Sequence, residues 1–430
     1  MKKIVVKPTE ELKGVITLPG DKSISHRAVM IGSIARGITR VRNFLDSQDC
    51  RRTINAFRML GINIRKDKNE LIVEGRGLKG LSKPKGPIYL GNSGTSIRLL
   101  SGILAGQKFS SRLRADSSLS KRPMKRIIDP LKLMGAEIRS TPGLRSECYP
   151  PLEIQGRELR SIKYNTKLAS AQVKSAILLA GLFGRGLTKV GEPAKSRDHT
   201  ERMLKFFGAD ISVKDKTVSL RSGELKGRSV DIPGDISSAA FFLAAAGLNK
   251  GSSLKLCSVG LNPTRTAILD VLRQMGVRIK IVNRHSKNFE PRGDVIVKKG
   301  TLRGIKISGS IIPGIIDEIP LVMVIASLAK GRTVIEDAGE LRVKETDRIS
   351  SMVSNLKILG ADIKESKDGA LIQGVDCLSG GRVKSFGDHR TAMSMVIAGL
   401  NAKGKTVIEN TACIDTSFPG FMDTFKKISS

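Results

Sequence analysis

The sequence predicts an α/β fold made of six copies of one unit that combines helices and strands. The first observation is a Gly-x-x-Ile frame that recurs five times, at spacings of 74, 73, 68 and 84 residues. Its glycines are Gly61, Gly135, Gly208, Gly276 and Gly360. The second observation is a set of six small-apolar segments, each preceded by a residue type that caps helix N-termini. These residues are Asp21, Asn92, Ser170, Asp235, Asp317 and Asp388.

Each unit is expected to begin with the small-apolar helix, which leads into a β-rich stretch. A second helix follows. In the fifth unit its apolar residues Ile349, Met352, Val353 and Leu356 fall at i, i+3, i+4 and i+7. The recurring glycine then ends this helix in the left-handed conformation, and a short alternating strand begins. We interpret these glycines as helix ends with no further role.

A unit of roughly 70 residues is too small to bury its own core well, so the units should pack in groups. The turn Ile232-Pro233-Gly234 precedes the fourth unit. Because Pro and Gly punctuate local structure, this turn is the best candidate for a joint between domains.

The composition is strongly basic, which indicates either an anionic partner or a generally basic proteome background. The net charge is +34, from 74 basic and 40 acidic residues. The basic residues are spread along the chain and not gathered in a tail, and no aromatic RNA-binding motif is evident. We therefore expect no specific nucleic-acid partner.

Cysteine usage and hydropathy predict a cytoplasmic protein. The five cysteines are odd in number and contain no CxxC pair, which favours free thiols in a reducing compartment. No N-terminal apolar stretch has the length of a signal peptide. The longest apolar run, 319–329, is far shorter than the roughly 20 residues of a membrane span.

Comparison of the repeats separates capping residues from candidate functional ones. The fourth unit begins with Asp235 and no nearby base, whereas Lys22 and Arg27 follow Asp21, and Arg390 follows Asp388. A helix N-terminus already carries partial positive charge, so added bases are unfavourable there unless an anion is bound. The alternative is a solvated surface charge in a basic protein.

The second helices carry a similar pattern. Arg122 and Arg197 stand at the starts of two of them, and Glu345 and Arg348 stand three residues apart at a third. Acids and bases together among anion ligands suit proton transfer to a phosphorylated substrate. The alternative for Glu345 and Arg348 is an ordinary i,i+3 ion pair.

Several segments resemble the signatures of the EPSP synthase family of enolpyruvyl transferases. Residues 18–27, Leu-Pro-Gly-Asp-Lys-Ser-Ile-Ser-His-Arg, and residues 90–98, Leu-Gly-Asn-Ser-Gly-Thr-Ser-Ile-Arg, are similar to the first two. Residues 342–348, Arg-Val-Lys-Glu-Thr-Asp-Arg, are similar to the third, and the segments 170–172 and 387–390 also match. The matches occur in family order along essentially the whole chain.

The resemblance implies two similar domains, each made of three βαβαββ-type repeats in an inside-out α/β barrel. The upper domain would comprise residues 21–233, and the lower domain residues 1–20 and 234–430, with the active site in the cleft between them. It implies a monomer that needs neither metal nor organic cofactor.

The family's activity would be transfer of the enolpyruvyl group of phosphoenolpyruvate to the 5-hydroxyl of shikimate 3-phosphate, a step of chorismate and aromatic amino acid biosynthesis. The resemblance assigns the phosphoenolpyruvate site to Lys22, Gly94, Arg122, Gln172, Arg348 and Arg390. It assigns the shikimate 3-phosphate site to Lys22, Ser23, Arg27, Ser170, Gln172, Ser196, Arg197, Asp317 and Lys344. It assigns catalysis to Lys22, Asp317, Lys344 and Glu345.

Within that assignment, Asp317 and Lys344 flank the reacting 5-hydroxyl, with Asp317 as the base. Capping of a helix is a compatible second role for Asp317. Either Glu345 or Lys22 protonates the methylene carbon of phosphoenolpyruvate, and the sequence leaves this choice open.

Two positions depart from the family pattern. Thr416 stands where some members have a Lys, which puts one phosphoenolpyruvate contact in doubt, and Ala171 stands where some have a second Ser. Ala171 and the segment 196–201 resemble the branch that includes glyphosate-tolerant enzymes. Gly94 nevertheless leaves room for glyphosate, so inhibition in competition with phosphoenolpyruvate is expected.

Two rival functions remain. The sister enolpyruvyl transferase acting on UDP-N-acetylglucosamine shares fold and donor but usually carries a reactive Cys in a loop that here, 115–125, has none. A basic nucleic-acid-binding repeat protein would show steeply salt-dependent binding to polynucleotide and no turnover.

Overall fold

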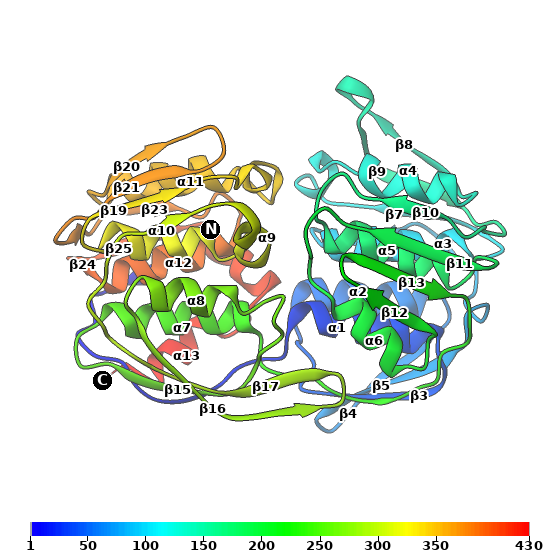
Figure 1. The fold of residues 1–430 in the computed structure, drawn as a ribbon, viewed down its shortest axis with the longest axis horizontal. Coiled ribbons are helices and arrows are strands. Elements are labelled where there is room, and N and C mark those ends of the chain that lie inside the picture. The colour runs from blue at the N-terminus through cyan, green and yellow to red at the C-terminus, as the bar shows by residue number, and fades with distance from the viewer. Residues whose placement is uncertain (1, 430) are drawn as a thin grey trace. The chain divides into compact units, whose positions relative to one another are not determined.

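The computed structural model describes residues 2–429 and divides into two compact units. Unit 1 comprises Met1–Pro19, Pro233–Ser286 and Glu290–Ser430, and unit 2 comprises Gly20–Ile232 with Lys287–Phe289. The blue-to-red colouring of Figure 1 follows the chain through both units. Each unit contains three repeats of the predicted kind.

The sheets of unit 2 share one topology. In each, the first two strands are parallel and the last two pairings are antiparallel. In order across each sheet, the strands are β14 (Ser229–Asp231), β3 (Arg36–Arg42), β5 (Glu70–Arg76) and β4 (Asn63–Asp67); β6 (Ile88–Tyr89), β7 (Ser110–Arg114), β9 (Cys148–Gln155) and β8 (Glu137–Pro142); and β10 (Lys163–Asn165), β11 (Leu187–Gly191), β13 (Thr217–Arg221) and β12 (Ile211–Lys214).

The sheets of unit 1 follow the same plan, and the N-terminal strand of the chain closes the last of them antiparallel to β25. The strands are β2 (Lys13–Thr17), β15 (Ser253–Gly260), β17 (Glu290–Lys298) and β16 (Arg278–Lys287); β18 (Lys306–Ile307), β19 (Arg332–Ile335), β21 (Ala370–Gln373) and β20 (Asp362–Glu365); β1 (Ile4–Val6), β25 (Thr406–Glu409) and β23 (Arg382–Lys384); and the parallel pair β22 (Leu378–Ser379) and β24 (Ala402–Lys403).

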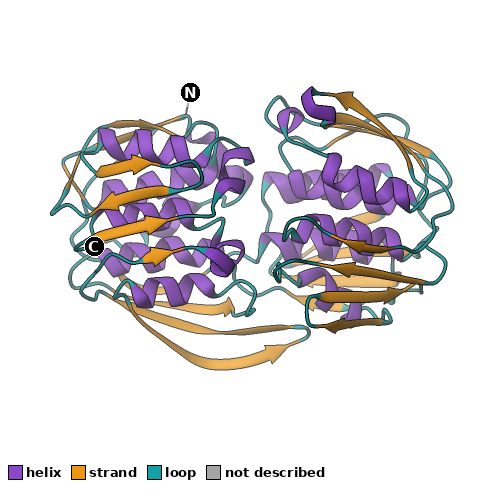
Figure 2. Cartoon of the chain, turned by 45° about the horizontal axis from the view of Figure 1, so that its top comes forward, coloured by secondary structure: helices purple, strands orange, loops and turns teal. Residues whose placement is uncertain are grey.

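Helices fill the interior of each unit, with the sheets along the outside (Figures 1 and 2). Those of unit 2 are α1 (Lys22–Ile34), α2 (Gln48–Met59), α3 (Gly94–Ala105), α4 (Lys125–Leu133), α5 (Ala171–Gly181) and α6 (His199–Phe206), with short 3-10 turns η1 (Leu119–Lys121) and η2 (Leu144–Ser146). Those of unit 1 are α7 (Ile236–Leu248), α8 (Ala267–Gln274), α9 (Ile312–Ile315), α10 (Ile319–Ser327), α11 (Arg348–Ile358), α12 (His389–Leu400) and α13 (Phe421–Lys426), with η3 (Gly309–Ile311), η4 (Gly339–Val343) and η5 (Thr411–Thr416).

The front helix of each repeat is a core helix. Every residue of α7, α10 and α12 is buried, and these three helices pack against one another inside unit 1. Helices buried on every side belong to the interior of the protein and not to its surface. The N-termini of these helices are therefore held in place by a well-packed interior.

Two strands lie in the unit that does not contain the helix following them. Strand β2 precedes α1 of unit 2 but pairs parallel with β15 of unit 1. Strand β14 precedes α7 of unit 1 but pairs parallel with β3 of unit 2. At both of these points the chain therefore passes from one unit to the other shortly after a strand.

The predicted helix ends are confirmed at the recurring glycines. Gly61, Gly135, Gly208, Gly276 and Gly360 have φ values of 86°, 100°, 97°, 100° and 84°. Residues other than glycine rarely adopt this conformation. The predicted core residues of α11 are buried as well.

Three of the six predicted helix caps are wrong or incomplete. The residue at the N-cap of α3 is Ser93 and not Asn92, and that of α10 is Glu318 and not Asp317. Ser170 occupies the N-cap position of α5, but its side chain makes no capping hydrogen bond. Residue type alone places a cap to within one position, because backbone dihedrals decide which residue is the last outside the helix.

Within residues 2–429, no single helix has both the length and the apolar composition to cross a bilayer. A bent pair of apolar segments, Gly309–Ile315 and Ile319–Ser327, passes by length and composition only, and its two parts meet at 107°.

Candidate active site

In unit 2, the start of α1 holds two of the predicted ligands, Lys22 and Ser23. Asp21 caps the helix by accepting from the backbone N–H of Ile24 at 2.9 Å. Lys22 Nζ lies 3.2 Å from Asp49 Oδ2 of α2, and Ser23 follows in the first turn. The ammonium of Lys22 is thus held by a carboxylate from the neighbouring helix, and both side chains are partly exposed.

Arg27 lies one turn further along α1 and is buried. Its Nε donates to Thr200 Oγ1 at 2.7 Å, its Nη2 donates to Ser175 Oγ at 2.9 Å, and its Nη1 donates to the carbonyl of Ser23 at 3.0 Å. Residues from α1, α5 and α6 therefore fix the guanidinium. This arrangement is unlike that of a solvated surface charge.

Gly94, the first residue of α3, lies under two guanidinium groups. A Cβ atom on Gly94 would come 2.8 Å from Arg98 Nη1 and 3.3 Å from Arg122 Nη1. Arg98 Nη1 also donates to Gln172 Oε1 at 2.8 Å, and Gln172 Nε2 donates to Thr95 Oγ1 at 3.2 Å. Three of the predicted phosphoenolpyruvate ligands therefore lie together around Arg98, a residue the sequence interpretation did not assign.

Arg122 is buried, but it does not lie in the helix that was expected to begin there. It follows η1 with an extended backbone, and α4 starts three residues later. Its Nη2 donates to Asn92 Oδ1. Arg122 is thus attached to the loop that leads into α3, which brings it to Gly94.

Ser196 and Arg197 lie in the loop between β11 and α6. The hydroxyl of Ser196 donates to Glu192 Oε1, and its N–H donates to Glu192 Oε2 at 3.3 Å. Glu192 is buried, and it binds Lys174 of α5. The sequence interpretation missed both Glu192 and Lys174.

In unit 1, Arg348 is the centre of the predicted set. Its Nε donates to Asp388 Oδ2 at 2.7 Å, its Nη1 to Asp317 Oδ1 at 3.1 Å and its Nη2 to Glu345 Oε2 at 2.6 Å. The side chain of Arg348 is 2% exposed. The i,i+3 ion pair considered for Glu345 and Arg348 is present, although Glu345 lies in the turn before α11.

Three segments are thereby joined at one guanidinium. Asp388 caps α12, Asp317 precedes α10 and Glu345 precedes α11. Burial alone would lower the pKa of Arg348, but the charges of Asp388, Glu345 and Asp317 outweigh it and raise that pKa. Asp317 therefore faces a buried cation. It does not cap α10, so the predicted capping role is wrong.

Lys344 lies in the same electrostatic environment. Burial lowers the pKa of its ammonium. The negative charge of Asp317 opposes this effect, and the positive charge of Arg348 lowers the pKa further. A lowered pKa makes an ammonium a stronger acid, which suits a group beside a reacting hydroxyl.

Arg390, in the first turn of α12, lies 3.7 Å from Glu318 Oε1. The hydroxyl of Ser237 also donates to Glu318, and Arg265 Nη2 donates to Ser237 Oγ at 2.6 Å. The fourth repeat, which lacks a base near its front helix in sequence, thus receives Arg265 from the segment before α8.

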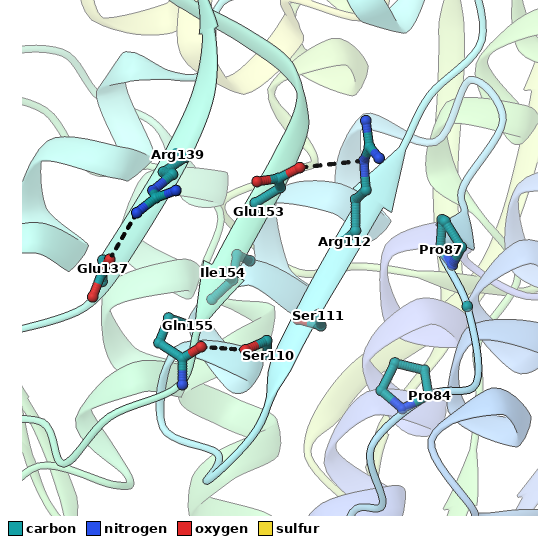
Figure 3. Close-up of a pocket in the computed structure, with 11 residues that line it drawn as sticks. Pro84, Pro87, Ser110, Ser111, Arg112, Glu137, Arg139, Glu153, Ile154 and Gln155 are labelled. Carbon is teal, nitrogen blue, oxygen red and sulfur yellow. Dashed lines mark hydrogen bonds and ion pairs between the residues drawn. The ribbon is translucent and has the colours of Figure 1, made fainter.

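A pocket of about 460 Å³ in unit 2 contains none of the predicted site residues. It lies over β7, β8 and β9, and Figure 3 shows its charges already paired, Arg112 with Glu153 and Arg139 with Glu137. This pocket is separate from the side chains described above.

Comparisons with known proteins decide the family. The model of the family EPSP synthase (3-phosphoshikimate 1-carboxyvinyltransferase) matches residues 6–425. The chain belongs to the EPSP synthase family. A 3-phosphoshikimate 1-carboxyvinyltransferase of Geotalea uraniireducens is 50% identical over 428 residues, covering 100% of this chain and 99% of the relative. Another, of Desulforamulus reducens, is 50% identical and covers 99% of both.

Solved structures agree with this assignment. An EPSP synthase from Acinetobacter baumannii superposes with a TM-score of 0.88 at 44% identity, covering 100% of this chain and 98% of that one. The family and the α/β fold expected from the sequence are both confirmed.

In this member of the EPSP synthase family, the structure also places the two residues that differ from the family pattern, Thr416 and Ala171. The hydroxyl of Thr416 donates to the carbonyl of Cys413 at 2.6 Å. Ala171 is the first residue of α5. One signal for the missed Lys174 was available, namely a single charged residue inside the segment 173–181, whose other residues are apolar or small.

Proposed function

We propose that this protein transfers the enolpyruvyl group of phosphoenolpyruvate to the 5-hydroxyl of shikimate 3-phosphate and releases phosphate. The observation that carries the proposal is the cluster of Asp317, Glu345 and Asp388 around Arg348, in a chain that belongs to the EPSP synthase family. The cluster combines a candidate base, a candidate acid and a cation in one site.

The reaction proceeds by addition and elimination. Protonation of the methylene carbon makes C2 of phosphoenolpyruvate electrophilic, and the 5-hydroxyl attacks C2 while it loses its proton towards Asp317. The resulting tetrahedral intermediate loses a proton from its methyl group and expels phosphate, which restores the carbon–carbon double bond. Lys344 stabilises the oxygen of the reacting hydroxyl.

The cationic residues hold the donor. We assign Lys22, Arg122, Arg348 and Arg390 to the carboxylate and phosphate of phosphoenolpyruvate, with Gly94 and Gln172 beside them. Cations that are already oriented by protein partners need little reorganisation when charge moves in the transition state. Holding both substrates in place also removes much of the entropic barrier.

Binding of phosphoenolpyruvate to Arg348 would displace carboxylates from it. With three carboxylates already around one guanidinium, an incoming anion competes with Asp317 and Glu345. A carboxylate that leaves its cation takes up a proton more readily. This exchange favours Glu345 over Lys22 as the acid, because it would prepare Glu345 for protonation when the donor arrives.

The acceptor is assigned to residues of unit 2 and to Asp317 and Lys344. Ser23 and Arg27 would hold its carboxylate, and Ser170, Gln172, Ser196 and Arg197 its ring and 3-phosphate. The two sets of residues would serve one bound pair of substrates.

The deciding experiment measures phosphate release from phosphoenolpyruvate with each acceptor. We expect release with shikimate 3-phosphate and none with UDP-N-acetylglucosamine. Release only with the sugar nucleotide would select the sister transferase. No release with either, together with steeply salt-dependent polynucleotide binding, would support the nucleic-acid rival.

We further propose that the protein acts as a monomer in the cytoplasm, with its two anionic substrates as its partners. Sedimentation velocity with and without both substrates tests the oligomeric state. A concentration-dependent dimer would contradict it.

A further inference from the structure

A buried cluster of three charges lies behind the loop that carries Ser196 and Arg197. Lys174 Nζ lies 2.6 Å from Glu192 Oε2 and 2.7 Å from Glu201 Oε1. The side chains of Lys174, Glu192 and Glu201 are 2%, 3% and 5% exposed. Lys174 lies in α5, Glu192 is the first residue after β11, and Glu201 lies in α6.

Glu192 determines the course of this loop. Both of its carboxylate oxygens accept hydrogen bonds from Ser196, one from the hydroxyl and one from the backbone N–H. The loop 192–196 is therefore folded back on its own first side chain. Because Glu192 is also held by Lys174, the loop is attached to α5 of the core.

A second connection between the same helices lies one residue further along. Ser175 follows Lys174 on α5, and Thr200 precedes Glu201 on α6, and their hydroxyl oxygens lie 2.6 Å apart. This second pair accepts hydrogen bonds from Arg27. Neighbouring connections between α5 and α6 thus support Arg27 on one side and the loop of Ser196 and Arg197 on the other.

Stabilisation of the core does not explain why this cluster is charged. Burying charges costs free energy, and apolar residues of similar volume often stabilise a core at least as well. One ammonium between two carboxylates is also an excess of negative charge. The cluster does, however, provide directional bonds that hold the loop in one conformation, which apolar packing would not do.

We propose that Lys174 and Glu192 are positioning residues that fix the loop 192–196 and thereby hold Arg197, which follows it, for the 3-phosphate of the acceptor. The inference rests on the proposed function, because the acceptor's phosphate is assigned to this loop. Neither residue touches substrate. Their effect is on how strongly the enzyme prefers the phosphate ester over shikimate itself.

The test compares equilibrium binding of shikimate 3-phosphate and of shikimate to full-length variants. Glu192→Gln keeps the shape of the side chain but places an amide NH2 opposite Lys174 or Ser196, both of which donate. We expect its Kd for shikimate 3-phosphate to rise about 10- to 100-fold, the usual effect of losing a hydrogen bond to a charged group. The Kd for shikimate should change less than about twofold, because Glu192→Gln leaves intact the Ser175–Thr200 pair that binds Arg27.

Lys174→Met serves as the second variant, with the same expected loss of preference. Its matched control is Lys205→Met, an exposed lysine of α6, which should bind both ligands as the wild type does. If Lys174→Met does not fold, as judged by circular dichroism, the Glu192→Gln result decides. Equal weakening of both ligands would show a merely structural role and overturn the proposal, as would unchanged binding of both.

Wild-type turnover separates this inference from the proposed function. Absence of phosphate release by the wild-type enzyme would contradict the proposed function. A wild-type enzyme that turns over, combined with Glu192→Gln that keeps its preference for the phosphate ester, would contradict only the positioning role.

Discussion

The carboxylate of Asp388 binds the guanidinium of Arg348 at 2.7 Å while it caps the helix that carries Arg390. Its Oδ1 accepts the N–H groups of Arg390 and Thr391, and its Oδ2 accepts from Arg348. One fully buried side chain thus connects a helix N-terminus to the cation at the centre of the proposed site.

Asp388→Asn should impair both stability and activity. An amide can accept on only one side, so either the helix cap or the bond to Arg348 is lost. We expect the free energy of unfolding to fall by about 1–3 kcal/mol and kcat to fall at least tenfold. Denaturant unfolding and phosphate release measure the two effects.

Asp423→Asn is the matched control for this change, because Asp423 is an exposed aspartate whose partner is Lys426 of the same helix. It should alter the free energy of unfolding by less than about 0.5 kcal/mol. An Asp388→Asn enzyme with wild-type kcat would contradict the proposed role of the Arg348 cluster.

Asp317→Asn should lower kcat by about 10²- to 10⁴-fold, the usual contribution of a general base. Asp317 is partly exposed and holds only one of the bonds to Arg348, so the melting temperature should change little. Steady-state kinetics with both substrates, beside a thermal melt, gives both quantities. The exposed Asp376→Asn provides the control. If Asp317→Asn were as active as that control, Asp317 would not be the base.

Gly94→Ala should weaken the binding of glyphosate more than the binding of phosphoenolpyruvate. The added methyl group would lie 2.8 Å from Arg98 Nη1 and 3.3 Å from Arg122 Nη1, so both guanidinium ends must move. We expect wild-type enzyme to be inhibited by glyphosate in competition with phosphoenolpyruvate. In the variant we expect the KM for phosphoenolpyruvate to rise several-fold and the inhibition constant of glyphosate to rise more.

The comparison variant is Gly223→Ala, since a Cβ atom at this exposed glycine meets no atom within 4 Å. It should leave both constants unchanged. A wild-type enzyme that is unaffected by glyphosate far above the KM for phosphoenolpyruvate would refute the expectation of inhibition.

His26 should make the protein less stable in acid. The ring is buried, its Nδ1 lies 2.7 Å from Thr53 Oγ1, and burial, aided by Lys22 and Arg27, lowers its pKa to about 3. The unfolded chain binds a proton at this histidine below about pH 6.5, whereas the folded chain does not until about pH 3. The stability due to neutral His26 is therefore complete above pH 6.5 and is lost as the pH falls towards 3.

At pH 5 this loss amounts to about 2 kcal/mol relative to pH 8. Urea unfolding at both pH values measures the free energy of unfolding of the wild type and of His26→Asn. On acidification the variant should lose about 2 kcal/mol less of this free energy than the wild type does. His285→Asn, at an exposed histidine, should lose as much as the wild type does. Identical acid dependence in all three proteins would contradict the assignment to His26.

Sequence reasoning located most of the candidate residues but few of their contacts. Lys22, Arg27 and Arg390 stood out because they exceed what a helix N-terminus requires. Their partners did not stand out. Asp49, Thr200 and Glu318 are ordinary residues until folding places them beside a cation. Asp317 shows the opposite case, because comparison with three other aspartates predicts a helix cap, whereas in the structure Asp317 binds Arg348.

The sequence by itself determined the repeats, the helix-ending glycines and the buried helix faces. These features depend on local rules, since a positive φ strongly favours glycine and helical periodicity places apolar residues on one face. Only the tertiary structure decided which charges meet. Arg348 and Asp388 are 40 residues apart, and Lys174 lies 18 residues from Glu192. Long-range ion pairs of this kind leave no periodic signal, because their geometry arises from the packing of helices from different repeats.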